Sequence, residues 1–226
     1  MNKLLPRIIV HNSISLDSSL TGFEVNMELH YKIANDFKPE AHLIGSNTIR
    51  TGLELYEGEI PEEEINDFEK QKRNTNLPYW IIIDTKGTLK DMLHMCRRFE
   101  FCKDLIILIS DDTPEEYKSY LEKRNYDYCI VGENHIDLNK ALTYLYDKYN
   151  IKTILTDTGR ILGNILINKD LVSEISLLVH PIIVGNNSYN MFGEVLNKMK
   201  LRLIKTEILK EEYMWLIYKI DDKNEI

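Results

Sequence analysis

The stretch from residue 153 to residue 166 constrains the fold more than any other part of this chain. A short apolar run over 153–156 stops at Asp157, Thr158 and Gly159, and apolar residues at helical spacing follow at once. This pattern predicts a strand, a tight turn and a helix. Such a junction offers free backbone N–H groups and the positive end of a helix dipole, which can bind a phosphate. Asp157 or Thr158 can instead serve only as a helix N-cap, so a purely structural role stays open.

Strand and helix patterns alternate as far as residue 170. We expect strands over 7–11, 41–45, 79–84, 105–110, 126–131 and 153–156, and helices over 24–37, 113–123, 138–149 and after residue 159. Further on, strands are expected over 174–180, 201–208 and 213–220, the last two as an antiparallel hairpin. The 226 residues are 43% hydrophobic, which suits a single α/β domain over 1–226 with a mixed, mainly parallel sheet flanked by helices.

The segment 57–78 differs in composition from its surroundings. It is acidic over 57–64 and carries mixed charge towards residue 73. We interpret it as a surface excursion, because a solvated loop is favoured here over a partner-binding face.

Composition excludes several classes of protein. A net charge of −8 with a pI near 5.3 disfavours a nucleic-acid partner. The three cysteines form no CxxC pair, which fits a reducing cytoplasm, and the six histidines show no metal-ligand spacing, so no metal site is expected. The N-terminus is too short for a signal peptide and no apolar run approaches the roughly 18–20 residues of a membrane span, so we expect a cytoplasmic protein with no membrane partner.

Polar turns follow four of the predicted strands. They span 13–17, 45–48, 84–87 and 157–160, and two of them carry a cation, Lys86 and Arg160. Because ligands collect at the carboxyl ends of strands in open α/β sheets, these turns suit a long ligand with several phosphates, such as a nicotinamide dinucleotide. There is no GxSxG elbow and no Walker A lysine. Asp17, Glu24 and Glu28 are the nearby carboxylates. Glu24 and Glu28 share a face of the predicted helix, either as a proton donor or as a solvent-facing acidic pair.

The chain resembles the reductase domain of the bacterial bifunctional riboflavin-pathway deaminase/reductase and the related archaeal and fungal diaminopyrimidine reductases. The resemblance spans about residues 6 to 220 and rests on motifs at 15–17, 41–48, 82–87, 157–164 and 171–185. It implies a dihydrofolate-reductase-like fold, NADPH as cofactor and a homodimer, with the terminal hairpin or the strand over 177–183 as interface.

Site residues follow from the same resemblance. Backbone groups of Ser13 and Ile14 would contact the nicotinamide, and Thr85 and Lys86 the adenosine ribose or its 2′-phosphate, which favours NADPH. The pyrophosphate and ribose would meet Gly45, Ser46, Asn47, Thr48, Thr158, Gly159, Arg160, Ile161 and Leu162. Asp157 would meet the cofactor ribose or the substrate, and the other substrate residues would be Ser15, Asp17 and Arg50. Asp17 or Glu24 would handle the proton.

The chain departs from the family pattern at several positions. Ser18 stands where the family has glycine, and Gly52 where it has aspartate. The arginines that would bind a ribose phosphate lack clear counterparts, with Arg7, Lys32 and Arg50 the nearest substitutes. The zinc deaminase signature is absent, so deamination is not expected.

Three functions therefore stay open. The first is an NADPH-dependent reductase of a riboflavin-pathway phosphoribosylamino-pyrimidine, converting its ribosyl group to a ribityl chain. The second is a non-catalytic nucleotide-binding module on the same fold. The third is a reductase of another small molecule, such as a dihydrofolate-like pterin.

Overall fold

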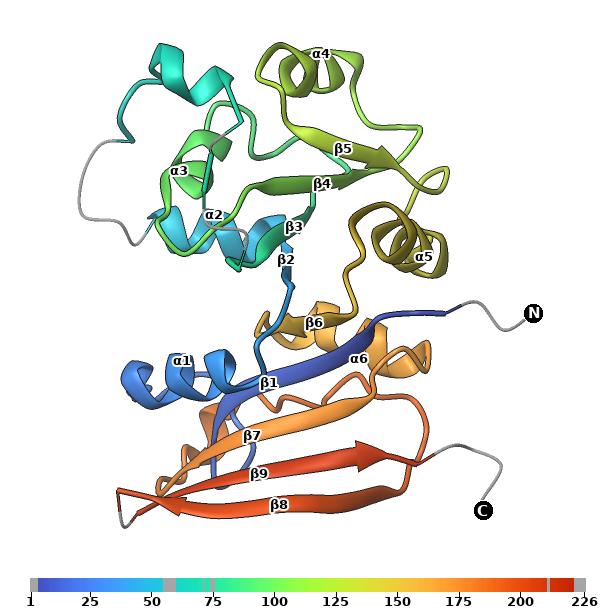
Figure 1. The fold of residues 1–226 in the computed structure, drawn as a ribbon. Helices are drawn as coiled ribbons and strands as arrows, with labels where there is room; N and C mark the ends of the chain where they lie inside the picture. Colours follow the sequence, from blue (N-terminus) through green and yellow to red (C-terminus); the bar gives the residue numbers. More distant parts are fainter. Residues whose placement is uncertain (1–3, 55–59, 71, 74–75, 211, 222–226) are drawn as a thin grey trace. The chain divides into compact units, whose positions relative to one another are not determined.

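The computed structural model describes residues 4–54, 60–70, 72–73, 76–210 and 212–221, and the chain divides into two units. Unit 1 comprises residues 1–6 and 40–152, and unit 2 comprises residues 7–39 and 153–226. Figure 1 shows the elements of both units in sequence colours. That the units form the single domain expected over 1–226 remains a prediction.

Unit 1 is built on four parallel strands in the order β5-β4-β3-β2. Its strands are β2 (Ala41–Gly45), β3 (Tyr79–Ile83), β4 (Leu105–Ile109) and β5 (Asp127–Ile130). Its helices are α2 (Ser46–Glu54), the 3-10 helix η1 (Ile65–Phe68), α3 (Leu93–Arg98), α4 (Glu115–Lys123) and α5 (Leu138–Tyr149). Every residue of β4 is buried, as a continuous apolar run covered on both faces should be.

Unit 2 combines parallel and antiparallel strands in the order β6-β1-β7-β9-β8 (Figure 1). Its strands are β1 (Arg7–Ser15), β6 (Thr153–Thr156), β7 (Glu174–His180), β8 (Leu201–Leu209) and β9 (Tyr213–Ile220). Its helices are α1 (Met27–Asp36), α6 (Arg160–Asn168) and the 3-10 helix η2 (Gly185–Asn187). β1 runs parallel to β6 and β7, and β9 runs antiparallel to β7 and β8, which confirms the predicted mixed sheet and terminal hairpin.

The helices α1 and α6 cover opposite faces of β1. The ring of His11 stacks on His30 of α1, whereas a methyl group of Val10 lies 3.9 Å from the Cβ position of Gly163 in α6. Successive residues of a strand point to opposite faces, so the two helices lie on either side. Polar and apolar side chains of β1 are therefore both buried.

The first helix begins later than the periodicity of 24–37 predicts. Asn26 caps α1 by accepting a hydrogen bond from the backbone N–H of Leu29 at 3.1 Å, and the helix starts at Met27. Glu24 thus precedes the helix, and the prediction that Glu24 and Glu28 share a helix face is wrong. The short helix α3 was not predicted, because six residues are too few to show a periodicity.

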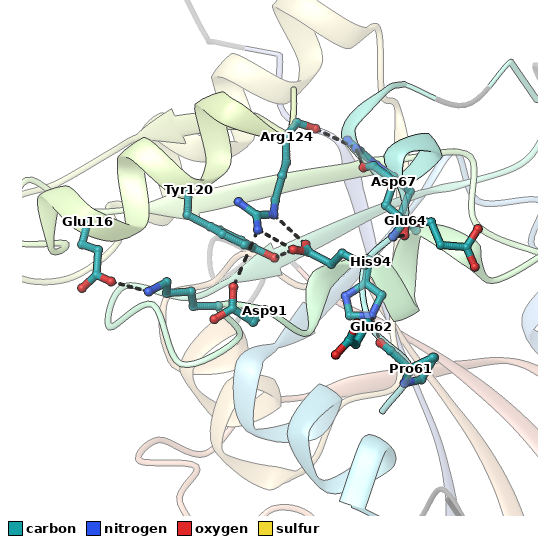
Figure 2. A network of polar contacts seen from close by, with 12 residues as sticks. Pro61, Glu62, Glu64, Asp67, Asp91, His94, Glu116, Tyr120 and Arg124 are labelled. Carbon is teal, nitrogen blue, oxygen red and sulfur yellow. Dashed lines mark hydrogen bonds and ion pairs between the residues drawn. The ribbon is translucent and has the colours of Figure 1, made fainter. Parts of the chain in front are cut away.

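Residues 60–70 pack against the rest of unit 1 through ion pairs (Figure 2). The guanidinium of Arg124 binds the carboxylate of Glu63, which holds the pKa of Glu63 below its usual value. Asp67 is only 4% exposed and accepts hydrogen bonds from Arg98 at 2.9 and 2.5 Å. Most residues of 60–70 are exposed, as predicted for a surface excursion, but these ion pairs tie the segment to α3 and to the end of α4. Parts of it lie outside the described residues, at 57–59, 71 and 74–75.

A search of the described residues finds no helix with the length and apolarity needed to cross a membrane.

Candidate functional site

The junction of β6 and α6 in unit 2 has the predicted strand–turn–helix form. The N-cap of α6 is Gly159, at φ −56°, and no side chain among the described residues caps the helix. The alternative that Asp157 or Thr158 is the N-cap is therefore wrong. The Thr158 hydroxyl instead lies 3.1 Å from that of Thr156. The first amides of the helix, which have no acceptor within it, stay available to an anion.

Space for a ligand is present at this junction. A Cβ atom built on Gly159 meets no heavy atom within 4 Å outside its two neighbours in the chain. Ile161, in the first turn, is 57% exposed, which leaves that turn open on one side. That Gly159, Arg160, Ile161 and Leu162 bind a cofactor through backbone groups stays a prediction.

The side chain of Arg160 is engaged by Tyr189 and Glu194. Its guanidinium lies 4.0 Å from the centroid of the Tyr189 ring and donates to the Glu194 carboxylate at 3.0 Å. Arg160 therefore anchors the segment around Tyr189.

Unit 1 forms a second strand–helix junction from the predicted residues 45–48. Gly45 ends β2 and Ser46 begins α2 directly, so Ser46, Asn47 and Thr48 form the first helical turn. A Cβ atom at Gly45 meets nothing within 4 Å outside its chain neighbours. This junction is again an open helix N-terminus at the carboxyl end of a parallel strand.

The turn after β3 lies at the same edge of unit 1, because Gly45 and Ile83 are register partners. Asp84 is 1% exposed, and its carboxylate accepts hydrogen bonds from Thr88 and Leu89 at 2.9–3.0 Å. The Thr113 hydroxyl donates to the Thr85 carbonyl at 2.9 Å. The turn is thereby fixed.

Gly87 and Lys86 have distinct places in this turn. Gly87 adopts φ +67°, and a Cβ there would lie 2.7 Å from the Tyr117 ring, so the turn requires glycine. Lys86 is exposed at the apex. A fixed turn with an exposed ammonium suits a phosphate group.

The end of β1 supplies backbone rather than side chains. The side chains of Ser13 and Ile14 are buried, at 6% and 4% exposure, and the contact of their backbone with a nicotinamide stays a prediction. The β1–β6 ladder ends at Val10, whereas the β1–β7 ladder continues to Ser15. The backbone of residues 11–15 therefore extends past the end of β6, on the side where Asp157 follows.

The carboxylate of Asp17 links two loops of unit 2 through hydrogen bonds. Its carboxylate accepts the Ser15 hydroxyl at 2.6 Å and the backbone N–H groups of Val184 and Gly185 at 3.1 and 2.9 Å. These hydrogen bonds, the one from Ser15 first, lower the pKa of Asp17 to about 2. The carboxylate is ionised at neutral pH, so it does not store a proton there. Its predicted catalytic role, like that of Glu24, stays a prediction.

Ser18, which stands where the family pattern has glycine, adopts a left-handed backbone conformation. Its φ is +64°, in the left-handed region that glycine adopts most readily.

The cations considered for a substrate phosphate are engaged elsewhere or exposed. Arg7 lies at the amino end of β1 and binds Glu174 at 2.5 and 3.0 Å, away from the carboxyl edge. Arg50 is exposed on α2 and lies 3.7 Å from Glu54. Lys32 is exposed on α1.

Two buried histidines of unit 2 were missed as site residues. His30 lies 3.0 Å from the Ser13 hydroxyl and 3.5 Å from the Asp157 carboxylate, and its ring stacks on His11 at 4.6 Å. Their positions in the sequence could have indicated that both are buried. His11 lies inside an apolar strand, and His30 lies next to Leu29 on the buried face of a helix. The structure thus joins Asp157 and Ser13 through an imidazole.

The fold is similar to solved structures of low sequence identity. A pyrimidine reductase-like protein from Corynebacterium diphtheriae is 15% identical, the match covering 96% of this chain and 93% of that one with a TM-score of 0.70. The riboflavin biosynthesis reductase Rib7 of Saccharomyces cerevisiae is 18% identical over 98% of this chain and 92% of that one, with a TM-score of 0.63. RibD of Acinetobacter baumannii is 15% identical, with a TM-score of 0.67. The match covers 96% of this chain but 58% of RibD, so the chain spans little more than half of that protein.

These likenesses show the fold, and the fold class expected from the sequence is confirmed. A family model described as the RibD C-terminal domain matches residues 6–215. The resemblance inferred from the sequence is therefore confirmed, and the chain belongs to the RibD C-terminal domain family.

Proposed function

We propose that this protein is an NADPH-dependent reductase. The observation that carries the proposal is the open N-terminus of α6, where Gly159 leaves both the helix amides and the adjoining space free for a pyrophosphate. Within unit 1, the open helix N-terminus after Gly45 is a second position with backbone donors suited to a phosphate.

NADPH is preferred over NADH in this proposal because of Lys86. The turn that carries Lys86 is fixed by Asp84 and Thr113, so the exposed ammonium can meet a 2′-phosphate with little loss of conformational freedom. NADH has only a hydroxyl at that position, and it gains no ion pair there.

The proposed substrate is a phosphoribosylamino-pyrimidine, of the class that riboflavin-pathway reductases use. Two of the similar structures are named as a pyrimidine reductase-like protein and a riboflavin biosynthesis reductase, which supports this class. NADPH, when bound, supplies a hydride to C1′ of the ribosyl group, giving a ribityl chain. The protein supplies orientation, through the backbone of 13–15 and 159–162, and a place for the proton.

A non-catalytic nucleotide-binding module remains the second candidate. It is favoured by the engagement of Arg7 with Glu174 and by the exposure of Arg50, since neither offers a preformed phosphate clamp for a substrate. This candidate predicts NADPH binding without turnover.

One experiment separates these functions. Isothermal titration calorimetry with NADPH and NADH is followed by absorbance at 340 nm with 5-amino-6-(5-phosphoribosylamino)uracil, and then with dihydrofolate. Tighter binding of NADPH and oxidation with the pyrimidine support the proposal. Binding without oxidation supports the module, oxidation with dihydrofolate supports a pterin reductase, and no binding of either nucleotide overturns all three.

We also propose a homodimer, formed through the terminal hairpin. β8 is an edge strand in which most residues are exposed, including Ile208 at 71% and Leu203 at 49%. An exposed apolar edge strand is a surface that folded proteins usually cover.

A further inference from the structure

His30 occupies a place in unit 2 where one imidazole contacts both a hydroxyl and a carboxylate. Its Nδ1 lies 3.0 Å from the Ser13 hydroxyl, and its Nε2 lies 3.5 Å from Oδ2 of Asp157. The His30 side chain is 10% exposed and that of Asp157 is 24% exposed. The Nε2 side therefore faces the Asp157 turn, and the Nδ1 side faces the interior of the unit.

Hydrogen-bond roles fix the protonation of the neighbouring His11. Its Nε2 lies 3.2 Å from the His30 carbonyl, which can only accept, so that nitrogen carries the proton. Its Nδ1 lies 3.0 Å from the Ser176 hydroxyl, and that oxygen in turn accepts the indole N–H of Trp215 at 3.0 Å. Ser176 thus has its hydroxyl proton free to donate to Nδ1. His11 is satisfied as a neutral imidazole, and its burial lowers the pKa to about 3.

His30 has no such restriction. The Ser13 hydroxyl can donate to Nδ1 or accept from it, so it serves the neutral and the charged ring equally. Asp157 faces Nε2 and stabilises a charged ring, whereas the other neighbours are the neutral His11, the phenol of Tyr31 at 5.3 Å between ring centroids, and His180 on β7. Of the stacked pair, His30 is the ring whose hydrogen-bond partners suit either protonation state.

We propose that His30 is the proton donor of the reduction. This inference rests on the proposed function and deepens it. As C1′ of the ribosylamine gains the hydride, the C1′–O4′ bond breaks and its electron pair goes to O4′. That oxygen takes the proton from Nε2 of His30 and becomes the C4′ hydroxyl. Asp157 holds the charged ring before the transfer, and Ser13 holds its orientation throughout.

A serine hydrolase does not fit the same residues. Ser13 lies within β1 and is 6% exposed, so its hydroxyl is not open to an attacking geometry on a substrate carbonyl. The part-buried Nε2 of His30 faces Asp157 and not Ser13. The serine thus orients the imidazole, and the reactive side is the one next to Asp157.

The test compares His30→Gln with His135→Gln, an exposed histidine of unit 1. NADPH affinity is measured by calorimetry, and kcat by absorbance at 340 nm with 5-amino-6-(5-phosphoribosylamino)uracil between pH 5.5 and 9. We expect His30→Gln to lower kcat by roughly 100-fold or more, to leave the NADPH Kd within about threefold, and to remove the fall of kcat at high pH. We expect His135→Gln to match the wild type. A His30→Gln kcat within about threefold of wild type, with an unchanged pH profile, overturns the inference.

A second measurement keeps the inference testable if the variant misfolds or the proposed function fails. Wild-type protein with labelled histidines is titrated by NMR over pH 5 to 9. We expect the His30 ring signals to move with pH while the His11 signals stay constant. Static His30 signals overturn the inference even when NADPH binds. Absence of NADPH binding overturns the proposed function instead, and the two failures are thereby distinguished.

Discussion

The imidazole of His11 stacks on that of His30, with ring centroids 4.6 Å apart and ring planes inclined by 30°. Burial, together with the neighbouring His30, lowers the pKa of His11 to about 3. A neutral His11 ring has a hydrogen-bond partner at each nitrogen, so it is compatible with a buried position. In a charged ring Nδ1 would also carry a proton, and it could no longer accept the hydroxyl proton of Ser176.

Unfolding stability is expected to fall as the pH drops below about 6.5. The folded pKa of His11 lies below the unfolded value of 6.5, so the unfolded chain binds more protons between pH 6.5 and 3. The stabilisation is complete above pH 6.5 and is lost progressively towards pH 3, by up to about 1.4 kcal/mol per pH unit. His180, whose pKa burial also lowers, acts in the same direction.

Urea unfolding at pH 8, 7, 6 and 5 measures this dependence. His11→Gln, which cannot titrate, is expected to flatten the decline below pH 6.5. If the free energy of unfolding of the variant fell equally steeply with decreasing pH, groups other than His11 would cause the dependence.

Gly159→Asp is expected to abolish NADPH binding while the protein stays folded. A side chain fits there without strain, because φ is −56° and nothing lies within 4 Å of the Cβ position outside the chain neighbours. The new carboxylate would occupy the anion position and repel a pyrophosphate. Gly159→Ala is the matched control, since it adds the Cβ without the charge. Calorimetry should show retained binding for alanine and none for aspartate; equal affinities would remove α6 from the cofactor site.

Lys86→Ala is expected to weaken NADPH binding by roughly tenfold and to leave NADH binding unchanged. The tenfold increase in the Kd for NADPH corresponds to the loss of one charge-assisted contact of about 1.4 kcal/mol with the 2′-phosphate. Lys123→Ala, another exposed lysine of unit 1, serves as control. An equal loss of affinity for NADPH and NADH would indicate that Lys86 lies near a group that both nucleotides carry.

Much of the fold could be predicted from sequence, because strong periodicity marks its elements. The apolar run of β4 and the change from a strand pattern to a helix pattern at Asp157 are local signals. The bounds predicted from both agree with the structure within one or two residues. The start of α1 was misplaced because its cap, Asn26, acts through a side-chain contact that apolar spacing does not report.

The candidate site was predicted less completely, because its polar contacts join residues far apart in sequence. Asp17 reads as an available carboxylate, yet it bonds to amides 167 and 168 residues away. The contact of His30 with Asp157 likewise spans 127 residues. Residues 60–70 look like a solvated loop by composition, yet their acidic side chains meet arginines of α3 and the end of α4. The charge of a carboxylate does not predict which group far away in the sequence it will bind.

Arg97→Ala is expected to destabilise the protein by about 3–5 kcal/mol. Arg97 is 1% exposed, and its guanidinium binds the Asp104 carboxylate at 3.0 Å and the carbonyls of Asp67, Arg124 and Asn125 at 2.8–3.1 Å. Alanine would leave a largely buried carboxylate and three carbonyls without this donor. Chemical denaturation gives the difference in unfolding free energy. Arg50→Ala, whose side chain is 47% exposed, should change stability by less than about 0.5 kcal/mol. A loss below about 1 kcal/mol for Arg97→Ala would show that solvent replaces these contacts.

Ile208→Glu is expected to convert the proposed homodimer to a monomer. Ile208 and Met214 are register partners on β8 and β9, and they are 71% and 39% exposed. Their neighbours Leu209 and Tyr213 pack with the core under α1, so Ile208 and Met214 lie on the opposite face of the hairpin. A carboxylate there would be buried without a partner in a dimer interface.

Light scattering after size exclusion measures the mass of wild type and variants at several concentrations. Lys219→Glu makes a charge change on the other face of β9, since Lys219 shares a face with the buried Ile217, and should leave the dimer intact. A wild-type mass of about 27 kDa at every concentration would contradict the homodimer itself. A dimer that survives Ile208→Glu would instead move the interface away from the hairpin, and the segment 177–183 is then the remaining prediction; its residues 181–183 follow the end of β7 and are exposed.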